Sequence, residues 1–243
     1  MTQEFFEIIS NNALTKDVFE LKLKGETSSL SAPGQFVNIK IDGQYLRRPI
    51  SVCDFDSNSL TLIYKIVGCG TEALSTYKPG KRLDLLVGLG NGFDVEKSGA
   101  NPVLIGGGVG IPPLFHLCKK LVSQGKNVSV ILGFNTISEL FYIDEFKKIS
   151  KNVIVCTVDG SYGIRGFVTD AMINMDYSYF YTCGPMPMFR AIENVATTSG
   201  QYSFEERMGC GFGACMGCSC KTKYGNKRIC VDGPVLLREE IIW

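Results

Sequence analysis

The run Glu206-Arg-Met-Gly-Cys-Gly-Phe-Gly-Ala-Cys-Met-Gly-Cys-Ser-Cys220 carries cysteines at positions 210, 215 and 218, and Cys230 follows at a greater distance. The spacing C-x4-C-x2-C…C is the plant-type ligand pattern of a [2Fe–2S] cluster. The interspersed glycines let the loop wrap tightly and aim backbone N–H groups at the cluster sulfurs. A one-electron centre needs an electron source and an electron acceptor, so this stretch predicts that the rest of the chain is electron-transfer machinery.

Zinc is the alternative occupant of these cysteines, because Cys-x2-Cys pairs also bind zinc. Zinc sites usually combine two short pairs of cysteine or histidine, whereas Cys230 stands alone and no histidine lies nearby. The gap between the first two cysteines also fits a zinc knuckle poorly. We therefore expect Cys210, Cys215, Cys218 and Cys230 to ligate a [2Fe–2S] cluster. We expect Cys220 to be either a packed thiol or a thiol that contacts the cluster ligands without binding iron.

The composition excludes several other classes of function. The 243 residues can form two domains and a small appendage, and the net charge of +1 gives no indication of nucleic-acid binding. No apolar run approaches the length of a membrane span, and the N-terminus lacks the basic and apolar regions of a signal peptide. Ten cysteines in such a chain favour the reducing cytoplasm, where thiols bind metals rather than form disulfides.

Residues 1–98 predict an antiparallel β-barrel, with a sandwich as the alternative, because short apolar stretches alternate with turn signals such as Ala32-Pro-Gly34 and Lys78-Pro-Gly80. A short helix is expected at 71–77. The expected strands are 19–23, 35–41, 50–53, 60–67 and 82–87.

Residues 99–202 alternate between apolar strands and helices, which predicts a parallel, Rossmann-like sheet. Residues 203–243 are too few for a complete ferredoxin domain and predict a small cluster-binding subdomain with a hairpin at 221–230. The expected strands of the middle block are 102–106, 128–134, 153–158 and 179–183, and the expected helices are 112–124, 139–149, 167–174 and 186–199.

Two strand ends in the middle block predict a nucleotide site. Gly106-Gly-Gly-Val-Gly110 lies where a strand passes into a helix, so the backbone can approach a pyrophosphate there. Cys183-Gly184-Pro185 ends another strand, and a small thiol followed by Gly-Pro can face a nicotinamide ring without crowding it. The alternatives are a tight turn without a ligand at the first site and a buried cysteine before a helix breaker at the second.

Two further motifs lie in the β block. In Arg47-Arg48-Pro49-Ile50-Ser51, an arginine and a hydroxyl three residues apart can both reach a phosphate if the strand bends. Lys65-Ile-Val-Gly-Cys-Gly-Thr71 adds a glycine-rich turn that starts a helix. A pair of solvated arginines is the alternative for the first motif, but both motifs together are most simply explained by one flavin nucleotide.

The order of these motifs closely resembles the electron transfer subunits of type B dihydroorotate dehydrogenases, within the ferredoxin–NADP reductase superfamily. The resemblance spans essentially the whole chain and is most specific at Cys210–Cys218 and at Cys230-Val-Asp-Gly-Pro234. It implies that FAD is held by Arg48, Pro49, Ile50 and Ser51, that Ile63, Tyr64 and Lys65 lie along the flavin, that Gly70 and Thr71 lie at its diphosphate, and that NADH is held by Gly106, Gly107, Gly108, Gly110, Cys183, Gly184 and Pro185.

The resemblance also implies a function. Electrons would pass from NADH through FAD and the [2Fe–2S] cluster to an FMN in a separate catalytic subunit that interconverts dihydroorotate and orotate. Pyrimidine biosynthesis would run this path from dihydroorotate to NAD. The family assembles as a heterotetramer of two copies of each subunit. Within this sequence, the stretch Gly133–Leu140 lacks an arginine for a 2′-phosphate, which favours NAD over NADP.

Two alternatives remain open. A related NAD(P)H reductase subunit, of the ferredoxin-dependent transhydrogenase or sulfhydrogenase type, resembles this chain, but some of these proteins have an aspartate where Cys210 stands. The other alternative is a non-enzymatic redox sensor with an iron–sulfur cluster. A sensor needs a regulatory output such as a basic DNA-binding element, and the sequence shows none.

Overall fold

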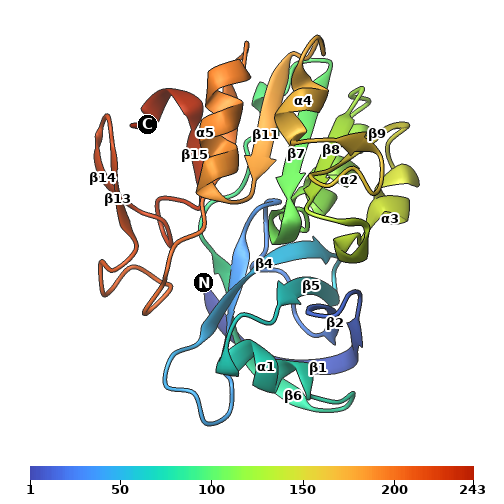
Figure 1. Cartoon of the computed structure of the whole chain (residues 1–243). Helices are drawn as coiled ribbons and strands as arrows, with labels where there is room; N and C mark the ends of the chain where they lie inside the picture. Colours follow the sequence, from blue (N-terminus) through green and yellow to red (C-terminus); the bar gives the residue numbers. More distant parts are fainter.

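The computed structural model describes all 243 residues and has a barrel, a seven-stranded sheet with helices, and a C-terminal hairpin. In Figure 1 the barrel lies below the sheet, and the cysteine-bearing segment (red) runs along one side of both. No helix is long and apolar enough to cross a membrane.

The barrel is closed, antiparallel and ordered β1-β2-β5-β4-β3-β6, as expected for the N-terminal block. Aliphatic side chains such as Leu21, Val37 and Leu85 fill its interior, and α1 (Cys69–Ser75) follows β5. The strands are β1 (Thr2–Ala13), β2 (Val18–Lys24), β3 (Phe36–Ile39), β4 (Arg48–Phe55), β5 (Ser59–Lys65) and β6 (Arg82–Leu89).

Strand β1 is absent from the sequence-based expectation, although it closes the barrel by pairing with both β2 and β6. Only Phe6 and Ile8 of this strand point into the core, and the remaining positions are largely polar or exposed. The period-two signal is therefore short, and it is obscured by the exposed apolar residues Phe5 and Ile9, which flank the two buried ones.

The sheet has the order β10-β9-β8-β7-β11-β12-β15, and all its pairs are parallel except the last. Successive residues of β7 alternate between two cores: Leu104 faces the core that contains α2 and α3, whereas Val103 and Ile105 face the core with α4 and α5. The strands are β7 (Pro102–Gly107), β8 (Ser129–Phe134), β9 (Asn152–Thr157), β10 (Ile164–Arg165), β11 (Tyr179–Cys183), β12 (Gly200–Ser203) and β15 (Val235–Leu237).

Four α-helices and four 3₁₀ turns accompany the sheet. The α-helices are α2 (Pro113–Ser123), α3 (Ile143–Lys147), α4 (Val168–Met172) and α5 (Met186–Val195). The turns are η1 (Val95–Lys97), η2 (Gly108–Gly110), η3 (Ile137–Glu139) and η4 (Arg238–Glu240).

Three helices are shorter than the sequence predicts by more than one residue at an end, and one of them, α4, spans only Val168–Met172 of the expected 167–174. The expected helix 139–149 begins only at Ile143, because Tyr142 has a left-handed backbone with φ 62°. The expected helix 186–199 ends at Val195, and Gly200–Ser203 forms strand β12 instead. The C-terminal hairpin consists of β13 (Ser219–Thr222) and β14 (Gly225–Arg228), so it begins two residues before the expected range of 221–230.

The barrel and the sheet share one apolar core. Cys53 and Ile63 of the barrel belong to the same buried cluster as Leu104 and Leu114 of the sheet domain. Polar contacts surround this core: the Tyr142 hydroxyl donates to Glu20 over 2.7 Å. The two halves are therefore held in a fixed relation by buried contacts.

Candidate functional site

The glycine turn after β7 lies at the point where the strand order of the sheet reverses. Strands β8, β9 and β10 extend to one side of β7, whereas β11 and β12 extend to the other. Gly106 is paired with Cys183 of β11, so the two predicted nucleotide motifs are neighbours. A Cβ atom at Gly110 would lie 2.3 Å from the Cys183 carbonyl oxygen, so only glycine permits this approach. Ligands of open parallel sheets bind at such a reversal point.

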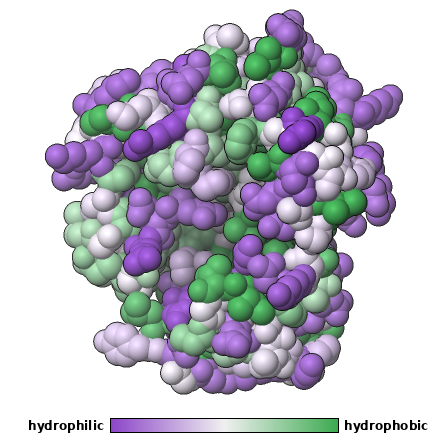
Figure 2. Space-filling model, viewed as in Figure 1, coloured by the Kyte–Doolittle hydropathy of each residue, from purple (hydrophilic) through white to green (hydrophobic).

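A cleft of about 560 Å³ opens at this point, within the usual size range of small-molecule sites. Figure 2 shows that this face of the molecule is hollowed between the barrel and the sheet domain. The cleft brings together several of the predicted residues with others that the sequence did not indicate. Its walls include Lys65, Gly107, Gly108, Gly110, Gly133, Asn135, Glu139, Gly166, Thr169, Gly184, Pro185, Met188 and Glu205.

Cys183 lies behind the cleft rather than in its wall. Its side chain is 1% exposed, and burial raises the pKa of its thiol well above the usual value, with smaller effects from Glu205 and Ser203. The thiol is therefore protonated and does not act as a nucleophile. Gly106 is likewise buried at the end of its strand.

Four polar residues of the cleft were not anticipated: Asn135, Glu139, Thr169 and Glu205. The Glu139 carboxylate accepts hydrogen bonds from the Asn135 backbone N–H over 3.1 Å and from its side-chain amide over 2.9 Å. The Glu205 side chain is exposed to the cleft, but protein atoms surround its carboxyl group. This partial desolvation raises the pKa of the Glu205 carboxyl. Asn135 follows β8 and Glu205 closely follows β12, so the strand-end rule could have identified both once β12 was recognised.

The two flavin motifs meet on adjacent barrel strands. β4 carries Arg48 to Ser51 and pairs with β5, which leads into α1. A Cβ atom at Gly70 would lie 2.3 Å from the Arg48 Nε, so the arginine and the helix-initiating turn are in contact. Thr71 shapes this turn, because its hydroxyl accepts from the Val67 N–H over 2.9 Å and donates to the Gly68 carbonyl over 3.1 Å.

The two arginines of the first motif have different partners. Arg47 makes a bidentate pair with Asp84, with both distances 2.9 Å. Arg48 donates only to neutral groups, which are the carbonyls of Leu46 and Arg47 and the Gln44 side-chain oxygen. A guanidinium group that has no carboxylate partner and lies beside a glycine turn can bind a diphosphate. Arg48, Gly70 and Thr71 therefore fit the phosphate end of a flavin nucleotide.

The predicted flavin contacts on β5 point in different directions. The Tyr64 side chain fills the barrel core, donates to Asn11 over 3.0 Å, and has its pKa raised to about 12 by burial. Ile63 faces the core shared with the sheet domain. Of the three residues, only Lys65 lines the cleft, where its ammonium group pairs with Asp17 at 3.0 Å.

The four predicted ligand cysteines form two neighbouring pairs. The Cys210 sulfur accepts from the backbone N–H of Cys215 over 3.4 Å, and the Cys218 sulfur accepts from the Cys230 N–H over 3.4 Å. No three His, Cys, Asp or Glu side chains converge closely enough to hold a single metal ion. Two pairs of thiols suit a binuclear cluster, in which each iron takes two of the four cysteines.

Backbone N–H groups make Cys210 ready to bind metal. Burial alone would raise the pKa of Cys210, but N–H groups of Cys215, Phe212 and Ala214 outweigh it and lower this pKa to about 6. Burial, followed by the neighbouring Cys218 thiol, raises the pKa of Cys230 to about 12. The ligand form of cysteine is the thiolate, so the donor set starts with one ligand readily ionised.

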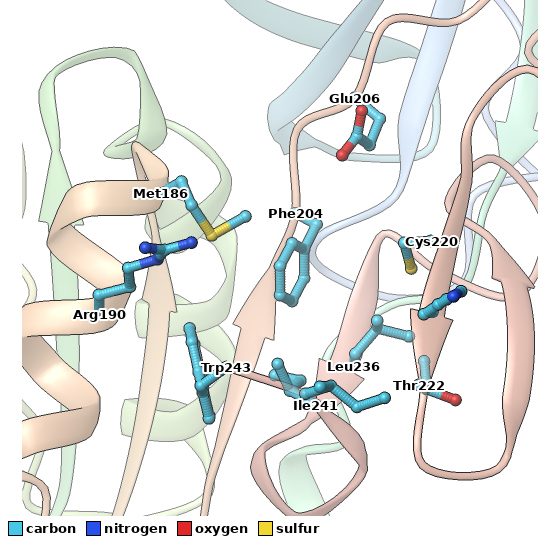
Figure 3. A pocket seen from close by; sticks show the side chains of 11 residues that line it. Met186, Arg190, Phe204, Glu206, Cys220, Thr222, Leu236, Ile241 and Trp243 are labelled. Atoms are coloured by element: carbon cyan, nitrogen blue, oxygen red, sulfur yellow. The ribbon is translucent and has the colours of Figure 1, made fainter.

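Cys220 lies in a different environment from the four predicted cluster ligands. It lines a small pocket of about 160 Å³ between α5 and the C-terminal residues. Figure 3 shows its sulfur on the side of this pocket opposite Met186 and Arg190, with Leu236 and Phe204 between them. Burial raises the pKa of this thiol. These features agree with the expected packed thiol.

Two family models match the chain. Residues 205–242 match the iron–sulfur cluster binding domain of dihydroorotate dehydrogenase B, and residues 104–194 match the oxidoreductase NAD-binding domain. An electron transfer subunit of dihydroorotate dehydrogenase B (NAD⁺) from Geobacillus sp. (strain WCH70) is 42% identical over 256 residues, covering 100% of this chain and 99% of the relative. The subunit of the same name from Fusobacterium nucleatum subsp. nucleatum is 43% identical and covers 95% of each chain.

Solved structures share the fold. An NADH-dependent reduced ferredoxin–NADP oxidoreductase chain superposes with a TM-score of 0.88 at 32% identity, covering 98% of this chain and 90% of that one. A flavohemoglobin from Malassezia yamatoensis superposes with a TM-score of 0.68 at 18% identity, covering 80% of this chain and 56% of that one. The second likeness concerns the fold alone.

Proposed function

Because this chain belongs to the family of dihydroorotate dehydrogenase B electron transfer subunits, we propose that it passes electrons between NAD(H) and a catalytic partner subunit by way of FAD and a [2Fe–2S] cluster. The partner would be the FMN-containing dihydroorotate dehydrogenase of pyrimidine biosynthesis, in a heterotetramer of two plus two subunits. The ten cysteines without a disulfide suit the reducing cytoplasm.

The residues divide among three cofactor regions. We assign 1–98 to FAD, 99–202 to NAD(H) and 203–243 to the cluster, although β15 of the last part joins the main sheet. When bound, the flavin links two-electron hydride chemistry to one-electron transfer, and the cluster relays single electrons. The chain supplies positioning: Arg48, Pro49, Ile50, Ser51, Lys65, Gly70 and Thr71 for FAD; Gly107, Gly108, Gly110, Gly184 and Pro185 for the nicotinamide nucleotide; Cys210, Cys215, Cys218 and Cys230 for iron.

Preference for NAD(H) is supported by the charge of the cleft. Glu139 follows the second strand of the nucleotide fold, where an acidic residue bonds a ribose 2′-hydroxyl and repels a 2′-phosphate. No arginine lines the cleft, and its one lysine, Lys65, is in the barrel. Cys183 would pack behind the wall that contacts the nicotinamide and would take no part in acid–base chemistry.

The observation that carries the proposal is the convergence of the three regions. The nucleotide cleft lies between β5 of the barrel and the reversal point of the sheet, and the segment that follows Glu205 leads directly into the ligand cysteines. The predicted nucleotide site, flavin motif and cluster ligands are thus close to one another in the fold.

Electron paramagnetic resonance on the anaerobically purified chain, recorded after NADH is added, tests the proposal. We expect the signal of a reduced [2Fe–2S] centre in protein that holds one flavin. Adding the catalytic partner with orotate should then remove the signal. A silent sample that contains zinc and no labile sulfide would contradict both the cluster and the electron-transfer function.

A reductase subunit that serves a different flavin complex is the second candidate. The superposition with the NADH-dependent reduced ferredoxin–NADP oxidoreductase favours it. Cys210 in place of the aspartate of some such subunits favours the first candidate. Reoxidation by ferredoxin, with no response to orotate and the dehydrogenase partner, would establish the second.

A further inference from the structure

Asn38 lies in the wall of the barrel beside the flavin motif. It is 1% exposed and is the cross-strand partner of Pro49 in the Arg48–Ser51 stretch. Its own carbonyl accepts from the Arg47 guanidinium over 3.3 Å. The neighbours Val37 and Ile39 point into the barrel core, so alternation directs the Asn38 side chain away from that core.

The side chain of Asn38 contacts the cysteine segment. Its amide nitrogen donates to the Cys210 carbonyl over 3.0 Å, across 172 positions of sequence. A Cβ atom at Gly211 would lie 2.4 Å from the same nitrogen, and Gly211 has φ +76°. The loop that presents the first predicted iron ligand therefore rests directly on Asn38.

Asn38 makes this contact at a cost. Its side-chain oxygen is buried and has no hydrogen-bond partner within the chain. Turning the amide over would bring two acceptor oxygens together at the Cys210 carbonyl, so the observed orientation is the favourable one. An apolar residue of the same shape would avoid the unpaired oxygen. The N–H bond to the ligand loop is what distinguishes asparagine at this position.

We propose that Asn38 is a positioning residue that fixes the Cys210 ligand loop relative to the flavin-binding strand β4, and thereby controls electron transfer between the two cofactors. The inference rests on the proposed function. It separates two steps: reduction of the flavin by NADH, which uses the cleft, and the one-electron step to the cluster, which depends on the relation of β4 to Cys210.

Stopped-flow absorbance with anaerobic holoprotein and NADH tests this separation. In Asn38→Leu, which removes the donor, and in Asn38→Asp, which replaces it with an acceptor, we expect flavin reduction at the wild-type rate. Cluster reduction should be about tenfold slower, the usual scale for loss of a group that orients a metal ligand. The cluster's resonance spectrum and midpoint potential should also shift, which a purely structural role would not produce.

Two further variants complete the test. Gly211→Ala disturbs the same contact from the loop side while Asn38 stays in place, so it should slow the same step. Asn226→Asp is the matched control, because Asn226 is exposed on the cluster hairpin and the change adds the same charge. It should leave both steps unchanged.

Each possible result either supports or contradicts the proposed role of Asn38. Wild-type cluster reduction, spectrum and potential in the Asn38 variants and in Gly211→Ala would overturn the role of Asn38. Loss of iron from all three, with flavin reduction intact and Asn226→Asp unaffected, would still support positioning of the ligand loop. A wild-type protein whose cluster NADH cannot reduce would refute the proposed function instead.

Discussion

The barrel with its sheet and the cysteine segment, residues 205–233, are held together in different ways. The first is built around large apolar cores, one of which joins Ile63 of the barrel to Leu114 of the sheet domain. In the second, few side chains are buried, among them Cys218, Ile229 and Cys230. The barrel and sheet, which carry the nucleotide and flavin motifs, are therefore stabilised mainly by the hydrophobic effect, whereas the cysteine segment depends on polar contacts and on its metal.

The polar contacts of the cysteine segment are few and specific. Asn38 holds the carbonyl of Cys210, and Asn91 donates to the carbonyls of Asp232 and Val235 over 3.1 and 2.8 Å. Arg228 donates to the Gly213 carbonyl over 3.0 Å. The segment is thus tied to the barrel side near both its first and its last cysteine. Its hairpin is tied to the C-terminal residues, because the Lys223 N–H donates to the Glu240 carbonyl and Lys227 pairs with the Glu240 carboxylate. The metal would hold the loop from Cys210 to Cys218.

The largest effect is expected when one of the four cysteines predicted to bind iron is replaced. Cys215→Ser should abolish cluster binding, because the thiolate of an exposed loop is replaced by a hydroxyl that binds iron weakly. Without metal, residues 207–233 should become sensitive to proteolysis, while flavin content and flavin reduction by NADH persist. Iron and sulfide analysis, limited proteolysis and flavin absorbance measure the three effects.

Cys220→Ser is the matched control for this ligand variant. Cys220 lies in the same segment but lines the small apolar pocket with Phe204 and Trp243. The control should retain iron, sulfide and protease resistance. Cluster loss from Cys220→Ser, or global unfolding of Cys215→Ser, would contradict the division between the two regions.

A substitution in the shared core should destabilise the barrel and the sheet together, in contrast to the local effect expected for Cys215→Ser. Leu114 is fully buried in the shared core, and Leu114→Ala should lower the free energy of unfolding by about 2–5 kcal/mol. Because that core belongs to both the barrel and the sheet, flavin release and loss of far-ultraviolet dichroism should shift together along a urea titration. Ile173→Ala, at a position 57% exposed, is the control and should change little. Two separate transitions would show that the core is not shared.

The same difference explains what the sequence could and could not predict. The alternating apolar patterns predicted the barrel and the parallel sheet, because burial follows local periodicity. Strand β15 was missed since its pairing with β12 depends on residues far away in the chain. The roles of Asn38 and Asn91 had no local signal, because each amide contacts backbone more than 100 residues distant. The assignments of individual residues to FAD, NAD(H) and iron stay predictions.

A moderate effect is expected from a substitution in the cleft between the barrel and the sheet. Such a substitution should change nucleotide affinity without lowering the stability of the protein. Glu139→Gln should weaken NADH binding and improve NADPH binding, since the charge that repels a 2′-phosphate is removed. Loss of one charged hydrogen bond corresponds to about tenfold in affinity. Titration calorimetry of both nucleotides measures the ratio, and Asp144→Asn, exposed on α3, is the control. An unchanged ratio would exclude Glu139 as the selecting residue.

The smallest effect concerns the polar contacts at the edge of the shared core. Asp54 of β4 accepts from Lys119 of α2 over 2.7 Å and contacts the His116 ring nitrogen at 2.7 Å. Burial alone would raise the pKa of Asp54, but the hydrogen bonds and charges of His116 and Lys119 outweigh it and lower this pKa below 3.8. Because the folded state holds the carboxylate more strongly than the unfolded chain does, the contribution is present above the unfolded pKa and is lost as pH falls through the lower, folded value.

Asp54→Asn should therefore destabilise the protein by about 1 kcal/mol at pH 5, since partly exposed ion pairs contribute little. The gap between wild type and variant should close as the pH falls below 3.8. Urea midpoints of the cluster-free protein, followed by far-ultraviolet dichroism, measure this gap without interference from acid loss of the cluster. A gap that widened toward low pH would mean that Asp54 binds its proton more tightly in the folded state, and that burial rather than the contact with α2 dominates at this junction.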